Sequence, residues 1–203
     1  MFRERVFLSS KFINFRAVKF DLITDEMKIL ITSALIQITF GLDKFVLRNF
    51  RTIMVSPNTY SFGEYEALLG HVDHIEKIIV VSWPSVKQGF IIPDDAFNVA
   101  LHELAHALQS ENLSRLIYRK FFDYMTMQEW EAEAEKELFN LRNKKHNHLK
   151  PYAGQNLMEL FAVCIETFFE QPVDFKAKLP KMYHVMVDLL DQDPTQGQNP
   201  LVK

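Results

Sequence analysis

The sequence predicts an α+β fold that is mainly helical, with a small β-sheet beside a helix that carries the motif HExxH. Four or more segments have the apolar spacing of helices, and two short runs rich in β-branched residues precede the motif. The 203 residues, of which 48% are hydrophobic, supply one sizeable core. We therefore expect a single domain over residues 1–190 and a polar, flexible tail over residues 191–203, where Pro, Gln and Asn are frequent.

The first expected helix begins after Thr24, a residue type that caps helix N-termini, and two acidic residues follow in its first turn. The apolar run MKILITSALIQITFGL ends at Gly41, which predicts a buried helix of about four turns. Two strands are expected next, over residues 51–57 and 76–84, because each run is dense in β-branched residues and stops at a proline.

The motif helix is expected to open at Pro93 with the acidic pair Asp94 and Asp95. Its apolar side chains recur at helical spacing, at Phe97, Ala100, Leu101, Leu104, Ala105 and Leu108. This period predicts that one face of the helix packs in the core.

Further helices are expected downstream. Residues 112–124 have an irregular helical period, and residues 127–145 form a strong, charged helix. Its glutamates, at positions 129, 131, 133, 135 and 137, mostly indicate a solvated face. The segment HNHLKPYAGQ is loop-like, after which Asn156 caps a helix that Pro172 ends. A last amphipathic helix is expected over residues 179–190.

Charge and cysteine content limit which partners and which cellular compartment are expected for the protein. A formal net charge of −3 gives no basic field for nucleic acid or anionic membranes, so neither partner is expected. The single cysteine, Cys164, lies in an apolar run and is expected to be a small buried hydrophobe in a reducing compartment. The N-terminal segment lacks the uninterrupted apolar region of a signal peptide, and no window reaches the roughly 18 apolar residues of a membrane span. These observations predict a cytoplasmic protein.

The stretch FNVALHELAHALQ holds two histidines four residues apart. His102 and His106 therefore lie one helical turn apart, on one face, where both imidazoles can chelate a single ion. Glu103 lies about 100° further round the helix, where it can reach a water on that ion rather than the ion itself. This division of labour is the one a metallopeptidase needs, because the carboxylate takes the proton of a metal-activated water.

The alternative is that these polar residues only decorate a core helix. By composition alone, HExxH is expected in about one or two of every hundred such chains. The flanks of the motif are almost wholly apolar, however, and an unpaired His-Glu-His set would be costly to bury there. The sequence therefore favours a metal site.

Two histidines need a third protein ligand if the fourth position is to hold water. No third histidine follows closely, since residues 109–115 contain none. Glu159 and Glu166 are the best candidates, because both lie in an otherwise apolar helix and share one face, about 10 Å apart. Two alternatives stay open: Glu159 completes a capping box with Asn156, and Glu166 is a buried carboxylate that hydrogen-bonds backbone or a histidine.

Several stretches resemble the Mlc titration factor A (MtfA) family of zinc peptidases. These are HELAHALQ, with Tyr152 46 residues and Glu159 53 residues after His106, inside PYAGQNLMELFAVCIETFFEQP. The resemblance continues upstream through ITDEMKILITSALIQITFGL, TIMVSP and VVSWPSVKQG, and covers most of residues 15–190. The metalloprotease domain of anthrax lethal factor is similar in its HExxH motif and its tyrosine-to-glutamate spacing. Family members often carry aspartate where this chain has Gln109.

The resemblance implies a site and a fold. His102, His106 and Glu159 would bind one Zn²⁺, Glu103 would be the catalytic base, and Tyr152 would hydrogen-bond the developing oxyanion. The implied fold is zincin-like, with a small sheet whose edge strand, near the VVSW segment, can hold an extended peptide. The implied activity is that of a peptidase or aminopeptidase on peptide or protein substrates.

Two other functions stay open. The family is also associated with binding the glucose-responsive repressor Mlc, so the protein could instead capture a transcriptional regulator, with proteolysis incidental. A purely structural zinc would need a fourth protein ligand, for which the sequence offers no good candidate. The remaining histidines, in HVDH (71–74), in HNH (146–148) and at His184, are expected to be surface or structural residues.

Overall fold

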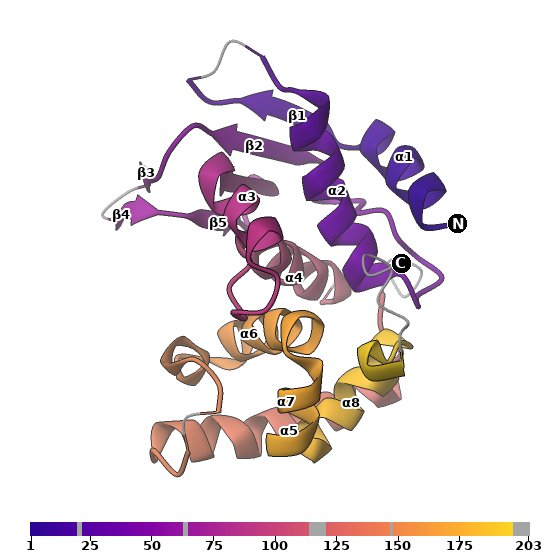
Figure 1. Ribbon diagram of the computed structural model, residues 1–203, viewed down its shortest axis with the longest axis vertical. Coiled ribbons are helices and arrows are strands. Elements are labelled where there is room, and N and C mark those ends of the chain that lie inside the picture. Colours follow the sequence, from indigo (N-terminus) through magenta and orange to yellow (C-terminus); the bar gives the residue numbers. More distant parts are fainter. Residues whose placement is uncertain (20–21, 63–64, 114–120, 147, 197–203) are drawn as a thin grey trace.

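The structure is a computed structural model that describes residues 1–19, 22–62, 65–113, 121–146 and 148–196, without the side chains of residues 60–66. Its α-helices are α1 (Phe2–Phe12), α2 (Asp25–Thr39), α3 (Trp83–Ile91), α4 (Val99–Asn112), α5 (Tyr124–Arg142), α6 (Leu157–Glu170), α7 (Pro172–Lys178) and α8 (Pro180–Leu190). Short 3₁₀ turns are η2 (Pro151–Gly154) and η3 (Pro194–Gln196). The predicted α+β, mainly helical class is confirmed. Figure 1 shows the sheet with α1–α3 in one half and α5, α7 and α8 in the other, with α4 and α6 side by side between them.

The main sheet has four strands in the order β1 (Asn14–Ala17), β2 (Thr52–Ser56), β6 (Ile78–Ser82) and β5 (Gly70–Asp73). Strands β1, β2 and β6 are parallel, and β5 is antiparallel to β6. A separate hairpin pairs β3 (Tyr60–Phe62) with β4 (Tyr65–Leu68). The two strands expected from the sequence are the central ones, β2 and β6.

The edge strand beside the motif helix is β5, and the VVSW segment lies next to it as expected, because Val80 and Val81 of β6 pair with His71 and Gly70 of β5. Residues 80–82 belong to β6, which has a neighbour on each side, and the chain turns into α3 at Trp83. Val81 is accordingly buried, with 1% of its surface exposed. Strand β5 was not predicted, because its four residues, GHVD, contain a single β-branched side chain.

Local capping explains where the site helices begin. Helix α4 starts at Val99 rather than at Pro93, because Asn98 is extended and its side chain accepts a hydrogen bond from the backbone N–H of Leu101. Asn156 caps α6 as expected and accepts from the N–H groups of Met158 and Glu159. Both asparagines fix the first turn of a helix that contributes to the candidate site.

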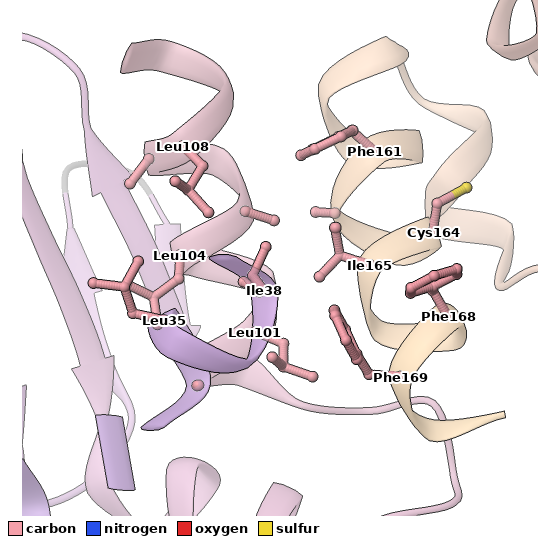
Figure 2. Packing of buried hydrophobic residues seen from close by; sticks show 14 of the residues in the cluster. Leu35, Ile38, Leu101, Leu104, Leu108, Phe161, Cys164, Ile165, Phe168 and Phe169 are labelled. Atoms are coloured by element: carbon pink, nitrogen blue, oxygen red, sulfur yellow. The ribbon is translucent and has the colours of Figure 1, made fainter. Parts of the chain in front are cut away.

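The core forms where α4 packs between α2 and α6. Figure 2 shows Leu35 and Ile38 of α2 beside Leu104 of α4, and Phe161 and Ile165 of α6 directed toward α4 from the other side. Helix α6 is buried at every position from 160 to 169, so it cannot shift along α4 without opening the core. Cys164 is fully buried in it, as expected, and burial raises the pKa of its thiol.

The expected tail begins with residues that pack against the rest of the fold. Gln192 is buried, and its side-chain amide donates to the carbonyls of Gln37 and Ile38 at the end of α2. Tyr183 donates to Asp193 at 2.5 Å. Residues 197–203, and residues 114–120 of the irregular segment predicted over 112–124, lie outside the described residues. Among the described helices, none has both the length and the apolar character needed to cross a membrane.

Candidate metal centre

Side chains from α4 and α6 converge at one point. Nε2 of His102 and Nε2 of His106 are 3.1 Å apart, and Oε2 of Glu159 lies 3.2 Å from the first and 3.3 Å from the second. Within the part of the chain that the structure describes, these are the residues grouped so that they could hold a metal ion. The structure thus brings together the three side chains that the resemblance implies as zinc ligands.

The spacing of these three atoms fits a tetrahedral ion. Ligands at about 2.0–2.1 Å from Zn²⁺ lie roughly 3.3 Å from one another in a tetrahedron, close to the separations found here. Oε2 of Glu159 is buried and makes no hydrogen bond with any described residue, although both imidazoles lie beside it. Two ring nitrogens and a carboxylate oxygen that approach one another so closely are suited to share a cation.

The position of the Glu159 carboxylate favours a metal ligand over a capping-box residue. Asn156 caps α6, but the Glu159 carboxylate approaches the two histidines across the helix interface. Burial acts to raise the pKa of Glu159, yet the neighbouring imidazoles outweigh burial and lower that pKa to about 2. The carboxylate is therefore ionised, as a metal ligand must be.

Glu166 lies about two turns after Glu159 on α6 and contacts the other ring nitrogen of His102. Its Oε2 is 3.2 Å from Nδ1 of His102, and its Oε1 accepts a hydrogen bond of 2.7 Å from the backbone N–H of Asn98. A proton on Nδ1 that is shared with this carboxylate leaves Nε2 free to bind a metal. In the metal-free chain, burial lowers the pKa of His102, but the carboxylates of Glu159 and Glu166, one beside each ring nitrogen, outweigh burial and raise the pKa to about 10.

Glu103 lies beneath the edge strand. Its side chain is buried, and a Cβ added to Gly70 of β5 would lie only 2.6 Å from Cγ and Oε1 of this glutamate. The backbone of β5 therefore passes directly over the carboxyl group. Burial raises the pKa of Glu103 to about 8, an effect that the His102 charge opposes and the charges of Glu159 and Glu166 support. A carboxyl group with such a pKa can both accept and return a proton near neutral pH.

Tyr152 stands at the side of the cluster, on η2. Its ring centroid is 5.9 Å from that of His102, and 47% of its surface is exposed. The guanidinium of Arg142 donates to the carbonyls of Gly154 and Gln155, which ties this turn to α5. The tyrosine is thus held beside the cleft while its side chain stays accessible.

A cavity of about 860 Å³ opens onto the cluster, and its lining includes two histidines that were expected at the surface. His71 lies on β5 and His74 follows that strand, where its Nδ1 is 2.9 Å from Oγ of Ser110. The sequence did not predict that His71 and His74 lie at the cavity, because β5, which positions both residues, was not predicted.

Other predicted positions lie elsewhere. His146 Nε2 is 3.1 Å from Oε1 of Glu137 and its ring stacks on His148 at 4.7 Å, so Glu137, which is 6% exposed, is not part of the expected solvated face. The ring of His184 lies 6.0 Å from that of Tyr183. Gln109, one turn after His106, is buried, and its Oε1 has no hydrogen-bond partner among the described residues.

Comparisons with known proteins show which sequences this chain resembles. Mlc titration factor A of Escherichia coli (strain 55989 / EAEC) is 27% identical over 124 residues, which is 58% of this chain and 46% of that protein. The protein of the same name from Shigella flexneri gives the same values. The match thus spans about half the length of these curated relatives. The family described as Glucose-regulated metallo-peptidase M90 matches residues 3–190, from α1 to the end of α8, and the chain belongs to this metallopeptidase family.

Proposed function

We propose that this protein is a zinc-dependent peptidase in which His102, His106 and Glu159 bind one Zn²⁺. The observation that carries the proposal is the triangle of donor atoms at 3.1–3.3 Å, built from helices whose relative position the core fixes. Membership of a metallopeptidase family supports the same function. A bound Zn²⁺ acts as a Lewis acid that acidifies a water molecule and polarises the scissile carbonyl.

The residues of the chain divide the remaining work. Glu103 accepts a proton from the attacking water and returns it to the leaving amine, a role that suits its buried, weakly acidic carboxyl group. Tyr152 donates a hydrogen bond to the oxyanion of the tetrahedral intermediate. Glu166 holds His102 in the orientation that presents Nε2 to the metal.

Metal analysis together with a profile of cleaved peptides tests the proposal. The purified chain should contain about one equivalent of zinc, and a chelator should abolish both the zinc and the cleavage. Glu103→Gln should keep the zinc and lose cleavage, whereas Tyr152→Phe should lower the rate about a hundredfold. Wild-type rates in Glu103→Gln, with contaminating proteases excluded, would refute the assignment of the base. The same profile separates aminopeptidase activity, which removes N-terminal residues one by one, from internal cleavage.

A second candidate function is capture of a transcriptional regulator. The name of the relatives, Mlc titration factor A, favours it. The intact base Glu103 weighs against capture as the whole function, because binding alone does not require it. A pull-down with Glu103→Gln beside the peptidase assay separates the two. Preserved capture with lost cleavage would show two independent activities.

A further inference from the structure

Two cavities meet at the candidate centre, and both include His102, Glu103 and Tyr152 in their walls. The larger, of about 860 Å³, continues past His106 and is lined by several polar side chains. The smaller, of about 320 Å³, continues toward the N-terminal end of α4. Its apolar lining comes from Leu68, Leu69, Phe97, Val99 and Val163, and we call it the apolar pocket.

We propose that the apolar pocket binds the side chain of the substrate residue immediately after the scissile bond, and that it selects a large aliphatic or aromatic residue there. This inference rests on the peptidase function proposed above and names its substrate class. It follows from the position of the pocket relative to β5 and from the chemistry of its walls.

The direction of the substrate follows from β5. This strand is the edge of the main sheet, and residues 70–72 of it line the larger cavity. An extended peptide can add to such an edge through main-chain hydrogen bonds, and antiparallel pairing is the more stable choice. The peptide then runs from the Asp73 end of β5 toward the Gly70 end. The apolar pocket contains residues 67–70 and the start of α4, so it lies on the C-terminal side of the bond to be cut.

The size of the pocket admits one side chain. A cavity of about 320 Å³ is at the lower limit of small-ligand sites, whereas the larger cavity has room for several residues. Val99 and Val163 are 5% and 1% exposed, so the floor is fixed by the core. A large apolar side chain gains free energy by leaving water there, while a charged one would lose its hydration.

Among the described residues that line the pocket, the lysine is Lys150, and its ammonium already has two contacts. The ammonium of Lys150 donates to the carbonyl of Ala96 and lies 4.4 Å from the centroid of the Phe97 ring. It therefore holds Phe97 against the start of α4 through a cation–π contact. This use of its charge argues against recognition of an acidic side chain, which would have to displace both contacts.

Binding of hydroxamates to the zinc-loaded chain tests the proposal without turnover. Three compounds are compared by calorimetry, each with a hydroxamate to anchor it and one side chain, of leucine, alanine or aspartate, at the position that follows the scissile bond. The leucine compound should bind about tenfold more tightly than the alanine compound, and the aspartate compound should be weakest. Equal affinities, or a preference for aspartate, would overturn the assignment.

Matched variants locate the preference. Val99→Phe fills the pocket and should remove the preference for leucine, leaving the two apolar compounds within about threefold of each other. Val72→Phe makes the same substitution in the larger cavity and should keep the preference. If Val99→Phe does not fold, Phe97→Ala serves instead, because Phe97 is 37% exposed and its loss only opens one wall. A leucine preference that survives both pocket variants would refute the proposal.

The failure of this inference differs from failure of the proposed function. Peptide cleavage without selectivity for the residue after the scissile bond would support the peptidase function and refute the proposed role of the apolar pocket. Selective binding of the leucine hydroxamate by a chain that cleaves no peptide would support the pocket and refute the peptidase.

Discussion

Gly70 shows how a single position can limit the chemistry of the site. No side chain fits between β5 and Glu103, since even a Cβ would come within 2.6 Å of the carboxyl oxygen. The atoms that would clash are the end of a flexible side chain and not backbone, so the glutamate would move and the strand would stay. The absence of a side chain at Gly70 thus leaves the space that the Glu103 carboxyl group occupies beneath β5.

Gly70→Ala should therefore lower kcat for peptide cleavage by about tenfold or more, because displacing a general base removes part of its 10²–10⁴-fold contribution. The melting temperature and the zinc content should stay close to those of the wild type. Gly154→Ala is the control, since its Cβ would meet Leu141 at an ordinary 3.8 Å. Unchanged kcat in Gly70→Ala would mean that Glu103 is not the base or is not confined by β5.

Glu170 gives a prediction for pH. Burial raises its pKa to about 7, against the hydrogen bonds that Asn98 and the Phe97 N–H donate to it. A carboxyl group with a raised pKa favours folding in its protonated form, so its contribution is full below about pH 4.5 and is lost as the pH rises through about 7. Glu170→Gln mimics the protonated form, so its stability relative to wild type should increase between about pH 4.5 and 7 and stay constant above that range. Chemical unfolding of both proteins with chelator present measures this, and a constant difference over that range would contradict it.

Some of the residues at the candidate site could be predicted from the sequence and others could not. The histidine spacing identified His102, His106 and Glu103 from a local pattern. The apolar helix made Glu159 and Glu166 candidates for the third ligand, and the resemblance favoured Glu159 and added Tyr152. Gly70 and Glu170 were out of reach, because each acts on a residue far along the chain. A glycine kept free for a side chain 33 positions later has no local signal.

The starts of helices α4 and α6 lie close to the three candidate ligand atoms, because His102 and Glu159 are the fourth and third residues of these helices. Asn98 begins α4, and Glu166 and Glu170 of α6 accept from the backbone N–H groups of Asn98 and Phe97. These hydrogen bonds attach the start of α4 to the last two turns of α6. Helix ends, and not only packed faces, thus fix the geometry of the candidate centre.

Asn156→Ala should test the start of α6. Loss of the cap should cost about 1 kcal/mol of stability, and zinc should bind less tightly because Glu159 lies in the unsettled first turn. Asp123→Ala removes an equivalent cap, from α5, and should cost a similar amount without changing zinc affinity. Thermal unfolding and competition with a chromogenic chelator measure the two effects. Equal zinc affinity in both variants would contradict the role of this turn.

Whether a helix or strand could be predicted depended on how clearly its residue composition indicates that structure. Helices α2, α5, α6 and α8 and strands β2 and β6 have long periods or β-branched runs, and each was expected within a few residues. Helix α1 and strands β1 and β5 were not, because their residues are mixed in character and tertiary contacts decide their conformation. The strand that forms the cleft wall was consequently missed, together with His71.

Across the whole molecule, the candidate centre connects two halves. Helix α4 contacts the sheet and α2, whereas α6 contacts α5, α7 and α8, and the donor atoms lie where α4 meets α6 (Figure 1). One hydrophobic cluster also runs through this interface. We propose on this basis that residues 1–190 form one domain, which the metal tightens rather than creates.

Removal of zinc should therefore lower stability without unfolding the chain. At zinc concentrations about 1,000 times the Kd, binding adds about 4 kcal/mol, or roughly 8–16 °C in Tm for a domain of this size. The chelated protein should keep its far-ultraviolet circular dichroism. Glu103→Gln should retain the zinc-dependent shift, and His106→Ala should lose it. A chelated chain that is fully unfolded would contradict the proposal that the core folds the domain and the metal only adds stability.

The contact of Gln192 with the end of α2 carries a consequence for biosynthesis. Gln192 is 155 positions after Gln37 and 154 positions after Ile38, whose carbonyls accept from its amide. The last turn of α2 therefore receives this amide only after nearly the whole described chain has been made. Contacts so distant in sequence form slowly, since a long loop must close first. During translation, the sheet half should wait in an incomplete state, exposed to chaperones and proteases, until residue 192 has left the ribosome.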